Sequence, residues 1–197
     1  MNKSIIAAFI LTASAMSGAN AGTVTFDSLE QAGNGFVSAP SHTEAGMLVS
    51  GDNLYSMQQD VEYYAGSAGM FSNTAGGRIM LTSVSGNVFS LNAIDLAPVA
   101  AFLGFNAVVS FTGNVRGGGT VSQSFVTGDT TPFSTFTFSG FNNLESVTWR
   151  QIPNFHQFDN IVVDAAAVPE PASLALFGLG LAGFAAARRR KTASKAA

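Results

Sequence analysis

Apolar and polar residues alternate with a period of two through the middle of the chain, residues 22–164. In the run Val108–Val115, for example, Val109 and Phe111 fall on one face and Ser110 falls on the other. Successive side chains of an extended chain point to opposite faces, so this pattern predicts half-buried β-strands. We expect strands over Thr23–Phe26, Gly86–Leu91, Val108–Val115, Thr120–Thr127, Phe133–Phe138, Val147–Gln151 and Phe158–Asp164.

Clusters of Gly, Ser, Asn and Asp separate these runs and predict the connections between strands. Gly117-Gly118-Gly119 predicts a hairpin loop, and the Gly-, Ser- and Ala-rich segment Ala65–Gly77 predicts a long surface loop. All but three of the 17 phenylalanines lie in residues 22–164. We expect them to supply the bulk that fills the layer between two packed sheets. The predicted fold class is all-β, a jelly-roll or two-sheet β-sandwich over residues 22–164.

The N-terminus, residues 1–21, has the three-part plan of a secretory signal peptide. Lys3 is followed by an apolar run over Ile5–Leu11 and then by small residues that end in Ala19-Asn20-Ala21. We expect signal peptidase to cut after Ala21 and to leave Gly22 as the first residue. The alternative is an uncleaved anchor, but the apolar run is short for the roughly 30 Å hydrocarbon core of a bilayer.

The C-terminus has three parts of different chemistry. A linker, residues 165–171, ends in Val168-Pro169-Glu170-Pro171, whose two prolines prevent a helix or a central strand and keep the segment extended. Residues 172–187 are small or apolar and predict a single short transmembrane helix, about 24 Å long at 1.5 Å per residue. A basic tail, residues 188–197, opens with Arg188-Arg189-Arg190-Lys191 and is expected to stay in the cytoplasm by the positive-inside rule.

The order and spacing of these three parts resemble the PEP-CTERM sorting signal of Gram-negative bacteria. The resemblance covers Val168 to Lys191. It implies recognition by an exosortase, a membrane protease that cuts near the Pro-Glu-Pro element, after transient residence in the inner membrane. It also implies delivery to the cell surface or to an extracellular matrix, with an association with exopolysaccharide and biofilm. An ordinary single-span anchor with a proline-rich linker is the alternative.

Charge narrows the possible partners of the middle segment. Residues 22–168 contain three arginines, no lysine and eleven acidic residues, a net charge of −8. This charge repels a phosphate backbone and so excludes nucleic acid as a partner, whereas a neutral polysaccharide, or a cation that bridges acidic polymers, is compatible. The chain has no cysteine, which excludes thiol catalysis and Cys-ligated metal sites.

The second half of the middle segment also resembles the jelly-roll domains that often accompany this tail, related in style to carbohydrate-binding modules. The matching stretches are Leu91–Leu96, Phe141–Trp149 and Phe158–Val163. Similar modules hold a structural calcium ion between their first and last strands. The residues placed to supply oxygen ligands here are Asp27, Glu30, Asp159 and Asn160. The alternative is that the aspartates at strand ends bond to nearby backbone groups.

Glycan binding requires exposed aromatic faces, and the candidate contacts are Tyr55, Tyr63 and Tyr64. Trp149 shares a face with Val147 and is predicted to lie in the core. No motif for acid–base, nucleophilic or phosphate chemistry is present. We therefore expect an exported, non-enzymatic protein with a structural role at the cell surface or in the matrix. The alternative is a carbohydrate-binding module that binds the exopolysaccharide.

Overall fold

The computed structural model of the protein describes residues 20–99, 106–129, 131–152 and 154–165, and the predicted all-β class is confirmed. The first half of the described chain contains β1 (Asn20–Val24), the 3-10 helix η1 (Asp27–Leu29), β2 (Phe36–Ser38), β3 (Ser41–Glu44), β4 (Met47–Gly51), β5 (Leu54–Met57), β6 (Met70–Ser72) and β7 (Arg78–Ser83). The second half contains β8 (Phe89–Pro98), β9 (Val108–Val115), β10 (Thr120–Val126), β11 (Ser134–Thr137), β12 (Leu144–Arg150) and β13 (His156–Ala165).

The predictions for the two ends of the chain fall mostly outside these residues. The signal peptide up to residue 19, the Pro-Glu-Pro linker from residue 166, the transmembrane helix and the basic tail are not described. No helix among the residues that are described is long and apolar enough to cross a membrane.

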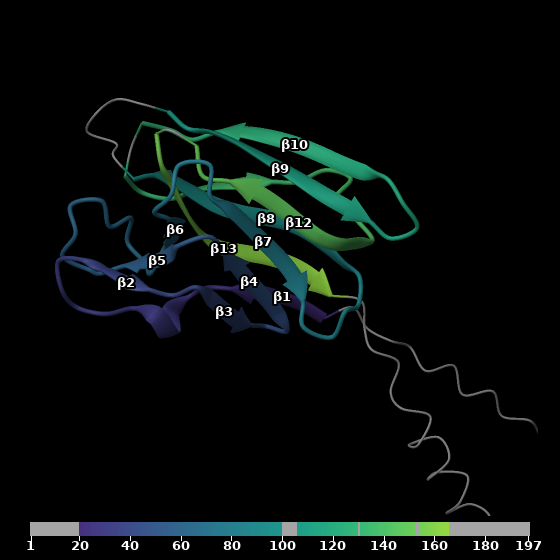
Figure 1. Ribbon diagram of the computed structural model, residues 1–197, viewed down its shortest axis with the longest axis horizontal. Coiled ribbons are helices and arrows are strands. Elements are labelled where there is room, and N and C mark those ends of the chain that lie inside the picture. The colour runs from purple at the N-terminus through teal and green to yellow at the C-terminus, as the bar shows by residue number, and fades with distance from the viewer. Residues whose placement is uncertain (1–19, 100–105, 130, 153, 166–197) are drawn as a thin grey trace, which may run out of the picture. The chain divides into compact units, whose positions relative to one another are not determined.

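The strands form two layers of antiparallel sheet. One sheet has the order β3-β4-β7-β12-β9-β10, which runs from bottom to top in Figure 1. The other has the order β2-β5-β6-β13-β8, with β1 also paired to β13 and β11 also paired to β8. A single pair of residues, Leu144 and Phe89, joins the two ladders, so the hydrogen-bonded chain of strands folds over on itself as a β-sandwich.

Aromatic side chains fill the layer between the sheets. Phe111 and Trp149 come from the first sheet, and their ring centroids are 5.2 Å apart. Trp149 then meets Phe158 of the second sheet edge-on at 5.1 Å, and Phe158 meets Phe26 at 5.7 Å. All four side chains are at most 2% exposed. The prediction that phenylalanines fill an inter-sheet layer is therefore confirmed.

The prediction that Ala65–Gly77 forms one long surface loop is wrong. Strand β6 lies within it, paired through Met70 both to Ser56 of β5 and to Phe158 of β13. Met70 is fully buried and Phe71 is 1% exposed. The small residues around this short apolar pair hide the strand in the sequence, because three residues are too few to show a period.

A bulge sets the orientation of β12. Its pairing with β9 shifts between Leu144 and Ser146, so Leu144 and Val147, three positions apart, both point into the core. Beyond the bulge, strict alternation directs Trp149 inward and leaves Arg150 exposed on the outer face. The predicted hairpin loop is also confirmed, since Gly117–Gly119, which joins β9 to β10, has φ between 90° and 108°, where glycine is favoured.

Candidate functional site

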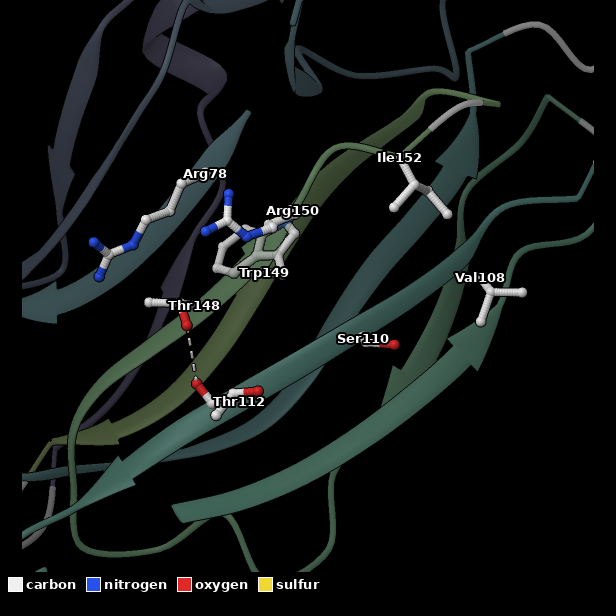
Figure 2. Close-up of a pocket in the computed structure, with 8 residues that line it drawn as sticks. All are labelled: Arg78, Val108, Ser110, Thr112, Thr148, Trp149, Arg150 and Ile152. Carbon is white, nitrogen blue, oxygen red and sulfur yellow. Dashed lines mark hydrogen bonds between the residues drawn. The ribbon is translucent and has the colours of Figure 1, made fainter. Parts of the chain in front are cut away.

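A groove of about 330 Å³ opens on the outer face of the first sheet. It is lined by side chains of β7, β9, β12 and the turn after β12, namely Arg78, Val108, Ser110, Thr112, Thr148, Trp149, Arg150 and Ile152. Figure 2 shows the two arginines toward one end, Val108 and Ile152 toward the other, and hydroxyl-bearing residues between them. The groove therefore offers cationic, hydroxyl and aliphatic surfaces in sequence along its length.

The groove exists because the ladder between β9 and β12 stops early. The last paired residues are Thr148 and Thr112, two positions short of Arg150 and Ser110. Beyond this point the two strands separate (Figure 2). The gap brings part of Trp149, whose ring belongs to the core, into the lining.

Hydroxyl groups continue outward from the groove across two strands. Ser110 and Ser124 of β10 are hydrogen-bonded at 2.8 Å, and Thr112 and Ser122 of β10 are hydrogen-bonded at 3.3 Å. The Thr148 hydroxyl donates to the carbonyl oxygen of Thr112 at 3.5 Å. These hydroxyls retain lone pairs or donors for a polar ligand, because a hydroxyl can donate one hydrogen bond and accept two.

The two arginines of the groove are cross-strand neighbours, since Arg78 pairs with Arg150 in the register of β7 and β12. The guanidinium of Arg150 donates to the carbonyl oxygen of Gly76 at 2.9 Å, and that of Arg78 contacts the sulfur of Met80 at 3.4 Å. Within the described part of the chain neither guanidinium has a carboxylate within 4.0 Å. Most of their hydrogen-bonding capacity therefore faces solvent and the groove.

Trp149 is a core residue, as its shared face with Val147 predicts. Its side chain is 2% exposed, and its indole N–H finds no acceptor among the described residues. The ring packs between Phe111 and Phe158. It therefore closes the base of the groove and does not present a flat face to a ligand.

The three tyrosines predicted as glycan contacts lie in another part of the domain. Tyr55, Tyr63 and Tyr64 are all half-buried and pack against a second, smaller core cluster formed by Met57, Phe71 and Val99. Tyr64 donates to the carboxylate of Glu30, and burial together with this carboxylate raises the pKa of Tyr64 to about 12. None of the three lines the groove, and their glycan contact stays a prediction.

Three of the four predicted calcium ligands have side-chain hydrogen bonds within the described structure, namely Glu30, Asp159 and Asn160. Asp27 begins helix η1, and Glu30 accepts from Gln59 at 2.9 Å as well as from Tyr64. Asp159 and Asn160 lie at a bulge of β13, where Asn160 has a left-handed φ of 45°. Among the described residues no three Asp, Glu, His or Cys side chains gather closely enough to hold a metal ion. Calcium binding is untested and stays a prediction.

Asp159 is an unusual carboxylate because it is fully buried. It accepts the hydroxyl of Ser67 and the backbone N–H of Asn160 at 2.7 Å. Burial raises the pKa of Asp159 to about 6, with a further contribution from the negative charges of Asp27 and Asp95, although its two hydrogen bonds oppose the shift. The group is therefore close to half-protonated in mildly acidic solution.

His156, at the start of β13, is fully buried without a hydrogen bond to either ring nitrogen among the described residues. Burial lowers the pKa of His156 to about 3, so the imidazole is neutral at physiological pH. It does not line the groove, and its neutral, enclosed ring gives it no role in acid–base chemistry there.

The comparisons with known proteins identify the C-terminal segment. The PEP-CTERM protein-sorting motif matches residues 167–191, so the sorting signal that the sequence resembles is present. The motif indicates a protein that is exported, is anchored in the membrane before processing, and is processed by an exosortase. No curated protein matches the chain.

Solved structures similar to the chain include carbohydrate-binding modules. A variant of the family 29 module CBM29-2 bound to mannohexaose has a TM-score of 0.44 and 13% identity, with 76% of this chain and 94% of that chain covered. The family 29 module CBM29_1 from Piromyces equi has a TM-score of 0.44 and 11% identity, covering 76% and 91%. The family 32 module of C. perfringens NanJ in complex with galactose has a TM-score of 0.39 and 10% identity, covering 64% and 98%.

Proposed function

We propose that this exported protein is delivered to the cell surface or its extracellular matrix, where its β domain binds exopolysaccharide without catalysis. The observation that carries the proposal is the groove between β9 and β12. It is open at the surface and bordered by the hydroxyls of Ser110, Thr112 and Thr148. Sugars are bound through such hydrogen bonds combined with contacts of their C–H groups, and Val108, half exposed at one end, supplies an aliphatic surface.

A non-catalytic role is supported by the composition of the groove. Hydrolysis of a glycosidic bond ordinarily requires a pair of carboxylic acids on either side of it. No Asp, Glu or His is among the residues that line the groove. A purely structural role, in which the domain binds no glycan, is the competing function.

Replacing Thr148 with valine is expected to weaken binding of the producing cell's exopolysaccharide by about 3- to 10-fold, because one hydrogen bond contributes on the order of 1 kcal/mol. Valine keeps the shape of threonine and removes only the hydroxyl. The measurement is co-sedimentation, or calorimetric titration, of the purified exported protein with that polysaccharide. Thr43→Val is the matched control, because Thr43 is exposed on β3 of the same sheet, outside the groove.

Three outcomes would contradict this proposal. Absence of binding by the unaltered protein would favour the purely structural role. Binding that is lost in Tyr63→Ala but unchanged in Thr148→Val would move the contact to the predicted tyrosine surface. Release of reducing sugar from the polysaccharide would overturn the non-catalytic role.

Cleavage at both ends of the chain can be tested separately from glycan binding. The intact mass of the protein collected from the cell surface is expected to correspond to a chain that begins at Gly22 and ends near Pro169–Pro171. The new N-terminus would still lie in β1, where Gly22 pairs with Val163 of β13. A mass that includes the complete tail, in cells that contain the exosortase, would contradict cleavage; any excess mass reports glycans attached to the chain.

A further inference from the structure

The groove has a charge that the composition of the domain does not predict. Residues 22–168 carry eleven acidic side chains and three arginines, yet two of these arginines lie in one groove with no acidic residue in its lining. Figure 2 shows Arg78 and Arg150 on adjacent strands. A locally positive groove in a negative domain is a feature of the surface that requires a physical reason.

The placement of the two arginines opposes stability. Like charges directly opposite each other on neighbouring antiparallel strands repel, and Arg78 and Arg150 hold such positions in the register of β7 and β12. Both are exposed, so solvent moderates the repulsion without removing it. A like-charge pair that costs stability and lies in the lining of a groove is typical of a binding site.

The third arginine of the domain, Arg116, lies outside the groove and differs from the other two in its partners. Arg116 forms an ion pair with Glu145 at 3.1 Å and donates to the carbonyl oxygen of Gly86 at 2.7 Å. Arg78 and Arg150 have no such ion pair in the described structure. The carboxylate of Asp52 accepts the backbone N–H of Arg78 at 2.9 Å and makes no ion pair with its guanidinium.

From these observations we infer that Arg78 and Arg150 bind the anionic group of an acidic saccharide, a carboxylate or a sulfate, within a glycan chain that occupies the groove. A guanidinium presents two parallel N–H donors that match the two oxygens of such a group. The adjacent hydroxyls of Thr148 and Ser110 are then placed for sugar hydroxyls. This inference rests on the proposed glycan-binding function, and it differs from the neutral polysaccharide with which the net charge of the domain is compatible.

The acidic remainder of the domain is compatible with this ligand at physiological ionic strength. Exposed charges separated by more than about 8–10 Å are largely screened at 0.10–0.15 M salt, whereas the two guanidinium contacts act at hydrogen-bond distance. We therefore expect binding to persist at 0.15 M salt and to gain little when the salt is diluted. A ligand attracted by a uniformly basic surface would behave in the opposite way.

The test compares two oligosaccharides of equal length that differ in one group of each sugar, a carboxylate in one and a neutral hydroxymethyl group in the other. One is an oligogalacturonate, and the other is the same oligosaccharide after reduction of its carboxylates to alcohols; a sulfated oligosaccharide of equal length distinguishes sulfate from carboxylate. The purified exported protein is expected to bind an anionic oligosaccharide about 10- to 100-fold more tightly than the reduced one. Arg78→Gln and Arg150→Gln are each expected to remove most of this preference, and Arg150→Lys to remove part of it, because lysine keeps the charge without the paired donors.

Two readouts separate binding from folding. Arg116→Gln, which breaks the ion pair with Glu145, is the matched control and should leave the preference unchanged. Arg78→Gln should leave the melting temperature unchanged or raise it, because it relieves the repulsion without breaking a hydrogen bond from the guanidinium to the backbone. Equal binding of charged and reduced oligosaccharides would overturn the acidic ligand and leave glycan binding intact. Binding of neither, nor of the cell's own exopolysaccharide, would overturn both, and tighter binding of poly-glutamate would assign the groove to an acidic peptide.

Discussion

Replacing Phe111 with alanine is expected to lower the free energy of unfolding of the β domain by about 3–5 kcal/mol, within the usual range for removing a fully buried aromatic ring. The ring is completely buried and is a centre of the aromatic layer. Its centroid lies 5.1 Å from that of Phe138, 5.2 Å from that of Trp149 and 6.0 Å from that of Phe125. The surrounding rings belong to strands and turns held by backbone ladders, so they cannot collapse fully into the cavity.

Urea denaturation of the exported protein measures this loss, and Phe36→Ala is the matched control. Phe36 is 42% exposed on β2, and among the described residues its ring contacts that of Phe71, with the centroids 4.9 Å apart. The same chemical change there is expected to cost about 1 kcal/mol, since less apolar area leaves water. Equal losses at the two positions would contradict the expectation that burial in the aromatic layer makes Phe111 the more stabilising of the two side chains.

The sequence predicted best the strands whose alternation continues over many residues. The period is visible in β9, β10 and β12, at seven or eight residues each. It predicts a core position for Phe111 on β9 and for Trp149 on β12, and both side chains are buried. Strands β2, β3, β5 and β6 have only three or four residues each, too few to show a period. They form because neighbouring strands supply hydrogen-bond partners, which is a property of the assembled sheet.

The groove could be predicted only in part, because it too depends on how strands pair in the assembled sheet. The alternation in β12 places Thr148 and Arg150 opposite Trp149, so its outer-face residues are visible in the sequence. Nothing local indicates that Arg78 lies beside Arg150, because the register between β7 and β12 decides it. The sorting motif, in contrast, could be predicted from the sequence, because its three parts follow one another along the chain and do not depend on strand pairing.

The buried pair of titratable groups predicts an unusual dependence of stability on pH. His156 has a pKa lowered to about 3 from its ordinary 6.5, so the unfolded chain binds its proton first and stability falls as the pH falls from 6.5 toward 3. Asp159 has a pKa raised from 3.8 to about 6, so the folded chain binds its proton first and stability rises as the pH falls from 6 toward 3.8. Between pH 6 and 4 the contributions of these two groups are expected to cancel.

Single variants should separate the two contributions. Asp159→Asn leaves the His156 contribution uncompensated, and its free energy of unfolding is expected to fall by about 3 kcal/mol between pH 6 and pH 4, at 1.36 kcal/mol for each pH unit and one proton. His156→Leu removes the imidazole, and the protein should instead gain about 3 kcal/mol over the same interval. These differences are measured relative to the unaltered protein, so that other carboxylates titrating in this range cancel.

The double variant is the decisive control for this pair. With both groups replaced, its change in stability between pH 6 and pH 4 should equal that of the unaltered protein, because each missing contribution has the opposite sign to the other. Urea denaturation across this pH range provides the measurement. If Asp159→Asn and the unaltered protein follow the same curve, the Asp159 carboxyl titrates as an ordinary group, and the burial and charge repulsion around it do not govern its protonation.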